Sequence, residues 1–171
     1  MANVHIRPEE PRDAAAIRSV TTAAFRTMPY SQQTEAAIVD ALRAGDAMTV
    51  SLVAVDGDEV VGHLAFSPVT IDGAKATGWY GVGPLSVHPD RQRQGIGSAL
   101  MKAGLQKIEA IGAAGCVLLG DPGYYRRFGF KVGGGLVYPD APAEYFQALA
   151  FSGTVPTGTV AFHNGFNATG G

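Results

Sequence analysis

The sequence has few of the residues that would place it in several large classes of protein. Its single cysteine, Cys116, excludes an internal disulfide, which fits a reducing compartment such as the cytoplasm. Charged residues make up only 16% of the chain and hydrophobic residues 46%, which excludes a disordered or coiled-coil protein. The four histidines are scattered and none forms a ligand-spaced pair, so we expect no metal site.

Long apolar runs and a strong charge imbalance are also missing. The apolar runs are too short to span a bilayer, and no secretion signal opens the chain, so we expect a cytoplasmic protein without a membrane partner. A formal net charge of -2 gives no electrostatic case for binding nucleic acid. We expect residues 1–171 to form a single domain whose last residues fray.

Hydrophobic periodicity predicts strands and helices along the whole chain. A first strand is expected over 4–7, followed by helices that begin at Pro11 and near Thr34. Two apolar runs flank an Asp-Gly turn and predict a hairpin, and Gly83-Pro84 within the next strand indicates a bulge or an unpaired edge. The other predicted elements are strands over 79–87, 115–119, 130–132 and 159–162, a helix over 95–111 that buries Ile96 to Ile111 along one face, and a short helix over 122–127.

The stretch from Val87 to Leu100 is the most informative part of the chain. It leads from an apolar strand through a polar turn into a long helix, and Gly95 and Gly97 remove two side chains where a backbone must approach something closely. The first N–H groups of a helix have no intrahelical partner and carry the positive end of its dipole. This combination predicts an anion site, and the natural anion is a phosphate or pyrophosphate.

The spacing of this segment decides between phosphate-binding families. No Gly-Lys-Ser/Thr tripeptide of a P-loop follows the glycines, and Leu100 occupies the third glycine position of the dinucleotide pattern. What remains is Gln92-x-x-Gly95-x-Gly97 after a strand, which resembles the signature of the GNAT superfamily of acetyl-CoA-dependent N-acetyltransferases. A second segment, from Tyr124 to Phe130, is similar to the Tyr-x-x-x-Gly-Phe motif of the same family.

The resemblance implies a fold, a reaction and a binding site. The expected fold is α/β, with a mixed, mostly antiparallel sheet that splays at its centre and is flanked by helices. Acetyl-CoA, the acetyl donor, would enter the splay and pair with the backbone of Leu85, Ser86 and Val87, where one N–H would face the thioester oxygen. The pyrophosphate would lie on the backbone of the segment Gln92, Arg93, Gln94, Gly95, Ile96, Gly97 and Ser98.

Tyr125 is the expected general acid. It stands four residues before Gly129, as the tyrosine of the family does, and a phenol can donate a proton to a departing thiolate. Tyr124 points elsewhere on a helix, and we expect it to pack against other side chains.

The sequence indicates the general base less clearly than the general acid. Glu35 lies on the apolar face of its predicted helix, and a buried carboxylate can act as a base near neutral pH. An equal alternative is that Glu35 only stabilises the helix dipole at the start of its helix. The resemblance also leaves open a proton relay through water without a dedicated base. His63 is a further candidate, although a core or surface histidine is the more common role, and Cys116 in its apolar run is expected to be a buried structural thiol.

The reaction implied by the resemblance is direct acetyl transfer to a primary amine, and two other functions stay open. One is a catalytically idle acyl-CoA-binding or sensing module, and the other is a nucleotide-phosphate binder that resembles the family only at its turn. The acceptor is unidentified, because fold does not fix substrate, and both a small-molecule amine and a peptide remain possible. Family members are often dimers, so the resemblance leaves a homodimer open.

Overall fold

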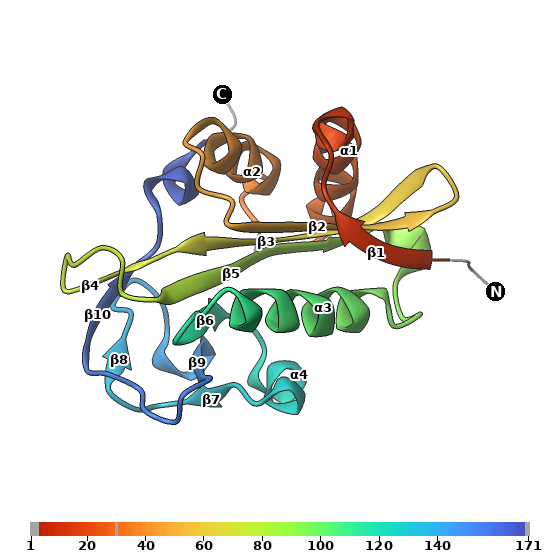
Figure 1. The fold of residues 1–171 in the computed structure, drawn as a ribbon. Coiled ribbons are helices and arrows are strands. Elements are labelled where there is room, and N and C mark those ends of the chain that lie inside the picture. Colours follow the sequence, from red (N-terminus) through yellow and green to blue (C-terminus); the bar gives the residue numbers. More distant parts are fainter. Residues whose placement is uncertain (1–3, 30, 170–171) are drawn as a thin grey trace.

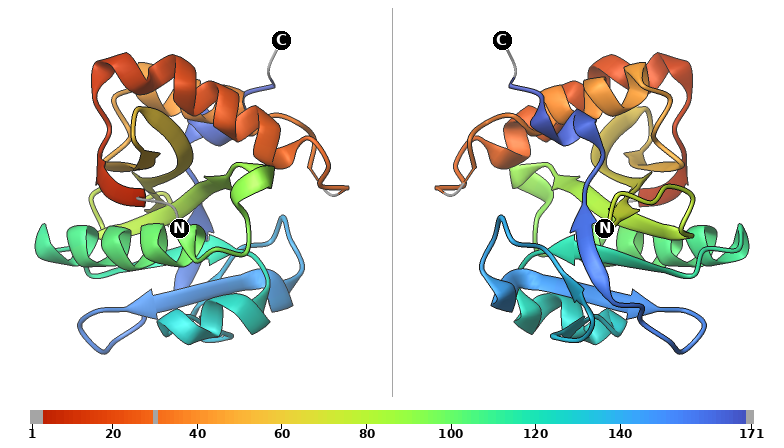
Figure 2. Two further views of the ribbon diagram at one scale, coloured as in Figure 1. Left: turned by 90° about the vertical axis from the view of Figure 1, so that its right-hand side faces the viewer. Right: turned by 90° about the vertical axis from the view of Figure 1, so that its left-hand side faces the viewer.

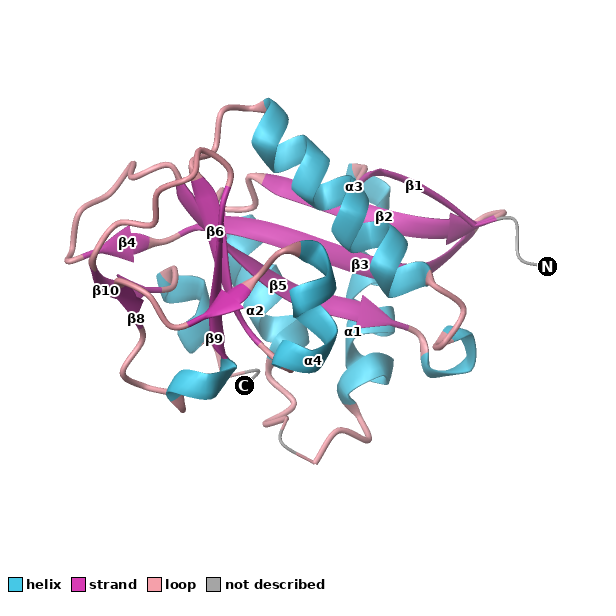
Figure 3. Ribbon diagram, turned by 90° about the horizontal axis from the view of Figure 1, so that it is seen from below, coloured by secondary structure: helices cyan, strands magenta, loops and turns pink. Residues whose placement is uncertain are grey.

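The structure is a computed structural model that describes residues 4–29 and 31–169. A central sheet separates two layers of helices: α1 and α2 cover one face, called here the α1 face, and α3 and α4 cover the other, called the α3 face (Figure 1). Figure 3 shows the α3 face, with α3 and α4 in front of the strands. The helices are α1 (Ala14–Phe25), α2 (Glu35–Ala44), α3 (Ile96–Ala110) and α4 (Pro122–Tyr125).

The central sheet has seven strands in the order β1-β2-β3-β5-β6-β9-β7. Every neighbouring pair is antiparallel except β5 and β6, so the expected mixed, mostly antiparallel sheet is confirmed. The strands are β1 (Val4–Pro8), β2 (Val50–Asp56), β3 (Glu59–Pro68), β5 (Trp79–Val87), β6 (Gly115–Leu119), β7 (Lys131–Val132) and β9 (Phe146–Ala150).

The predicted hairpin is formed by β2 and β3. Asp56 pairs with Glu59 across a tight turn in which Gly57 has a φ of +62°, a conformation that glycine adopts without strain. The apolar residues that alternate along the two strands face opposite sides of the sheet, where Leu52 and Leu64 pack toward α3 and Val53 packs toward α1. The hairpin therefore supplies core to both layers.

The predicted irregularity of β5 is also confirmed. Its register with β3 shifts so that Leu64 pairs with Leu85 and Phe66 with Val82, which inserts one extra residue into β5 around Gly83. On its other edge β5 pairs with β6 only from Trp79 to Gly81. We call the gap in pairing between the 82–87 portion of β5 and the end of β6 the seam, and it is the splay expected at the centre of the sheet.

Helix α3 lies close to the sheet because glycine occupies its contact with β3. A β-carbon at Gly104 would lie 2.5 Å from Cε1 of the fully buried Phe66. Leu100 and Ile108 complete the buried face as predicted. Ile111 does not belong to it: the helix ends at Ala110, and Ile111 is 57% exposed at the C-cap.

The C-terminal third differs most from the expectation. The strand predicted at 159–162 is β10 (Gly158–Ala161), which belongs to a second, three-stranded sheet with β4 (Thr70–Ile71) and β8 (Leu136–Val137). The prediction from sequence did not include β8, nor β9, which lies between β6 and β7. Within the segment expected to fray, the 3-10 turn Asn164–Asn167 lies against α2 (Figure 2), where Gly165 packs on Leu42. Gly170 and Gly171 lie outside the described residues.

Candidate active site

The turn before α3 forms a backbone cradle, defined here as residues 92–98. Gln92 fixes its start, because its side-chain Nε2 donates a hydrogen bond of 3.2 Å to the carbonyl of Val87 at the end of β5. Gly95 is the N-cap of α3 with a φ of +85°. The first intrahelical hydrogen bond runs from Ala99 N–H to Gly95 O at 3.0 Å, so the N–H groups of 96–98 precede the helical ladder. These N–H groups and the helix dipole make the first turn suitable for an anion.

The side chains of the cradle contribute less than its backbone. Gln92, Arg93, Gln94 and Gly95 are exposed, whereas the side chain of Ile96 is buried in the core beneath α3. Arg93 has a φ of +64° and makes no ion pair with any described residue, so its charge is available beside the turn. Arg91, just outside, is instead bound to Asp56 at 2.7 Å.

Leu85, Ser86 and Val87 lie on the seam as expected. The side chains of Leu85 and Val87 are on the α3 face, where a β-carbon at Gly97 would lie 3.9 Å from Leu85 Cδ2 and 3.6 Å from Val87 Cγ2. Ser86 is buried on the α1 face, paired across the strands with His63. The backbone edge of these residues that faces away from β3 lies beyond the three residue pairs that join β5 to β6.

Tyr125 lies in a packed setting at the end of α4. Its ring stands edge-on to Phe130, with 6.2 Å between ring centroids, and fills the space left by the missing side chain of Gly120. A β-carbon at Gly120 would overlap the ring. Gly120 itself is held by the Gln147 side chain, whose Nε2 donates to its carbonyl at 2.9 Å, and its own N–H donates to Tyr145 O at 3.0 Å. The position of the Tyr125 ring is therefore set by the end of β6 and by β9.

Tyr124 points away from Tyr125 and toward the cradle. The two rings are 4.9 Å apart and nearly perpendicular, and the Tyr124 hydroxyl lies 3.6 Å from the position of a β-carbon at Gly97. The guanidinium of Arg127 lies 4.6 Å from the centre of the Tyr124 ring. The expectation that Tyr124 only packs against other side chains missed this contact, because a four-residue helix has no periodicity that would orient it.

Comparisons with known proteins show the family to which this chain belongs. The acetyltransferase (GNAT) domain model matches residues 48–132, which include the cradle and the Tyr-x-x-x-Gly-Phe segment. The Escherichia coli protein described as "Uncharacterized N-acetyltransferase YhbS" is 38% identical over 128 residues, which cover 74% of this chain and 73% of that protein. The chain belongs to the GNAT family of N-acetyltransferases.

Two solved GNAT structures extend the match beyond this segment. A Brucella melitensis GNAT acetyltransferase, in complex with acetyl-CoA, has 55% identity, a TM-score of 0.87 and coverage of 97% of this chain and 99% of its own. Escherichia coli YhbS, in complex with CoA, has 33% identity and the same TM-score, with coverage of 98% and 93%. The GNAT fold of this acyltransferase is thus shown over nearly the whole chain.

Within this GNAT chain, Glu35 is the first residue of α2. Its carboxylate oxygens each lie 2.8 Å from the hydroxyl of Ser31, and the side chain is half-buried. This place in the first turn suits the helix dipole, and Ile38 and Leu42 further along are buried as the apolar face requires. This position is compatible both with a carboxylate that stabilises the helix dipole and with a general base.

His63 is a core histidine. It is fully buried, and its Nε2 lies 2.8 Å from Ser51 Oγ. Burial, with the nearby charge of Arg43, lowers its pKa to about 3, so the ring is neutral at physiological pH. Cys116 is likewise fully buried, and burial raises the pKa of its thiol, in line with the expected structural role.

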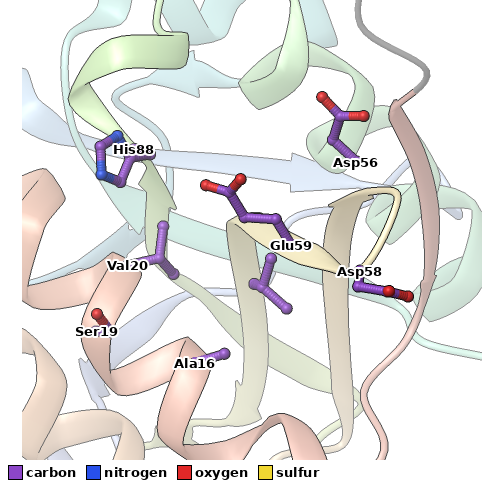
Figure 4. A pocket seen from close by; sticks show the side chains of 8 residues that line it. Ala16, Ser19, Val20, Asp56, Asp58, Glu59 and His88 are labelled. Atoms are coloured by element: carbon purple, nitrogen blue, oxygen red, sulfur yellow. The ribbon is translucent and has the colours of Figure 1, made fainter.

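A separate hollow of about 680 Å³ lies between α1 and the β2–β3 hairpin (Figure 4). The carboxylates of Asp56, Asp58 and Glu59 gather on one side of it, and Val20 of α1 lies on the other. This negative lining disfavours an anionic ligand. Among the described residues no group of acidic, histidine or cysteine side chains could hold a metal, and no helix is long and apolar enough to cross a membrane.

Proposed function

We propose that this GNAT chain transfers the acetyl group of acetyl-CoA directly to a primary amine. The observation that carries the proposal is the juxtaposition of the cradle with the seam: a helix N-terminus with free N–H groups lies beside a strand edge that β6 leaves unpaired. The complexes of the Brucella melitensis and Escherichia coli relatives with acetyl-CoA and CoA support the same ligand here.

The residues present fit acetyl-CoA. A β-carbon at Gly95 would meet nothing within 4 Å, so the cradle is open above this glycine, and the N–H groups of 96–98 are suited to a pyrophosphate. The backbone of Leu85, Ser86 and Val87 would pair with the extended arm of the donor, and Arg93 would add positive charge. When bound, acetyl-CoA supplies an activated acyl thioester.

The proton transfers are assigned to two side chains. Tyr125 would protonate the departing thiolate, and its fixed ring position against Gly120 supports this role. Glu35 would take the proton of the amine, and the contact of α2 with β5 supports a base on the α1 face. Cys116 is fully buried in β6, which favours direct transfer over an acetylated cysteine.

The acceptor is a small-molecule amine or a peptide amine, in a cytoplasmic setting that suits the single buried thiol. Calorimetric titration of the purified chain with acetyl-CoA, CoA, ATP and NAD tests the donor. We expect stoichiometric binding of acetyl-CoA and CoA, and preference for ATP or NAD would contradict the proposal. A panel of amines, followed by thiol release, then separates an enzyme from an idle acyl-CoA-binding module.

The variant Gly97→Glu tests whether the cradle binds acetyl-CoA. It places a side chain and a negative charge at the first turn of α3, so we expect acetyl-CoA affinity to fall by about 100-fold or more. Lys102→Glu is the control, because Lys102 is exposed on the same helix. Equal affinity of the Gly97→Glu and parent proteins would remove the cradle from the binding site.

A further inference from the structure

The two adjacent tyrosines of α4 are divided between two surroundings. Tyr125 packs against Gly120 and Phe130, whereas the ring of Tyr124 turns by 89° relative to it and carries its hydroxyl to the first turn of α3. Tyr124 thus connects α4 with the cradle. Nothing in the Tyr-x-x-x-Gly-Phe spacing requires a phenol at this position.

The Tyr124 hydroxyl meets the cradle at a defined place. A β-carbon built at Gly97 would lie 3.6 Å from Tyr124 Oη and equally far from Val87 Cγ2. The bare face of Gly97 is therefore bordered by β5 on one side and by this phenol on the other. A phenol is a hydrogen-bond donor, and bonds to a charged acceptor are stronger than those to a neutral one.

Arg127 holds the Tyr124 ring and adds charge to this side. Its guanidinium lies 4.6 Å from the ring centre, a cation–π arrangement, and it makes no ion pair with any described residue. Phe128 packs edge-on to the same ring at 5.6 Å. The phenol is thus held between an aromatic and a cationic neighbour.

We propose that Tyr124, with Arg127 stacked on its ring, forms the second wall of the anion site. In this arrangement the N–H groups of 96–98 bind the phosphate groups of the donor from one side, and the Tyr124 hydroxyl donates to them from the side of α4. The proposal rests on the proposed function, and it separates the two tyrosines: Tyr124 binds the donor, and Tyr125 acts on the thiolate.

The test is the affinity of two probes for the full chain: CoA, which carries the phosphates, and pantetheine, which lacks them. We expect Tyr124→Phe to raise the Kd of CoA about 10-fold and to leave the Kd of pantetheine unchanged. Arg127→Gln should raise the Kd of CoA about 3-fold and weaken its dependence on salt. Tyr145→Phe and Arg126→Gln are matched controls, since Tyr145 is 46% exposed at the end of the 3-10 turn before β9 and Arg126 is exposed without the ring contact.

Three results would overturn the inference. The first is an unchanged Kd of CoA in Tyr124→Phe, and the second is an equal loss of affinity for pantetheine. The third is a fall in kcat at saturating acetyl-CoA with an unchanged Kd, which would make Tyr124 the acid. Thermal unfolding of each variant identifies any loss of CoA affinity that comes from misfolding. Tyr124→Leu is a second substitution that removes the phenol from the anion site. Failure of the parent chain to bind CoA would instead refute the proposed function.

Discussion

The two faces of the central sheet are held to their helices by different kinds of contact. On the α1 face a partly buried polar network joins β2, β3 and α2 to the end of β1. The Glu9 carboxylate accepts bonds of 3.0 and 3.1 Å from Arg43 and one of 2.5 Å from Ser51, which in turn lies 2.8 Å from His63. On the α3 face the contacts are apolar and close, as at Gly104 against Phe66.

This difference shows how one sheet can hold its helices by polar bonds on one face and by close apolar packing on the other. Directional bonds on the α1 face fix α2 and the end of β1 in place, while Nδ1 of His63 and Oγ of Ser86 are buried there without a hydrogen-bond partner among the described residues. Gly104 brings the backbone of α3 against the side chain of Phe66, and the N-terminus of α3 lies beside the edge of β5. The proposed anion site therefore lies on the face whose contacts need no buried charge.

The largest effect on stability should come from the apolar contacts of the α3 face. Leu100→Ala removes a fully buried side chain of α3, so we expect a loss of about 3 kcal/mol in the free energy of unfolding. Lys102→Ala, on the exposed side of the helix, should change it by less than about 0.5 kcal/mol. Urea unfolding of both variants measures the contrast, and similar losses would show that α3 is not held by its buried stripe.

The stability contributed by the polar contacts of the α1 face should depend on pH. His63 has a pKa of about 3 in the folded chain and an ordinary value of 6.5 when unfolded, so the unfolded chain binds more protons between these values. Stability contributed by the neutral ring is complete above pH 6.5 and is lost as the pH falls, by about 2 kcal/mol between pH 7 and pH 5.

Urea unfolding across this range measures the slope. His63→Gln should flatten it, whatever its effect on stability at pH 7, while His5→Gln should leave it unchanged because His5 is exposed. An undiminished slope in His63→Gln would place the pH response in other groups.

Next in size is the effect of Gly120→Ala on turnover. The added methyl overlaps the Tyr125 ring and displaces it, so we expect kcat to fall about 10-fold, because the proposed acid is moved away from the thiolate. The Kd of acetyl-CoA should change little, because Gly120 lies outside the cradle. Steady-state kinetics with titration of the donor measures both, and a parent-like kcat would show that the ring position is unimportant.

The smallest effect concerns an ion pair that is exposed rather than buried. Arg18 and Asp40 bridge α1 and α2, and their side chains are 52% and 44% exposed. Asp40→Asn should therefore lower the free energy of unfolding by less than about 1 kcal/mol. A chemical denaturation curve that shifted further would assign part of the stability of the α1 face to its surface.

Much of the fold follows from local sequence patterns, and the exceptions have physical reasons. The strand from Trp79 to Val87 and the helix from Ile96 to Ala110 could be predicted because each carries its own periodicity and end signals. The strand Phe146–Ala150 could not, since Gln147 is polar yet buried, with its Nε2 bonded to the carbonyl of Gly120. Only the folded chain brings those two residues together.

The candidate site divides in the same way. The cradle from Gln92 to Ser98 could be predicted from spacing, because its glycines and the helix start are adjacent in sequence. The hydroxyl of Tyr124 beside Gly97 could not, since it depends on how α4 is placed against α3. Gly83-Pro84 predicted the bulge in β5. The length of the seam could not be predicted, because it depends on where β6 stops pairing with β5.

The contact of Gly165 with Leu42 has a consequence for the order of events on the ribosome. Most of the chain lies between these two residues, and Leu42 is fully buried in the finished molecule. As the chain is synthesised from its N-terminus, α2 emerges long before residues 163–169 are made, so this side of the helix stays exposed to water and to chaperones in the interval. Leu42 can therefore gain this cover only after residues 163–169 have been made.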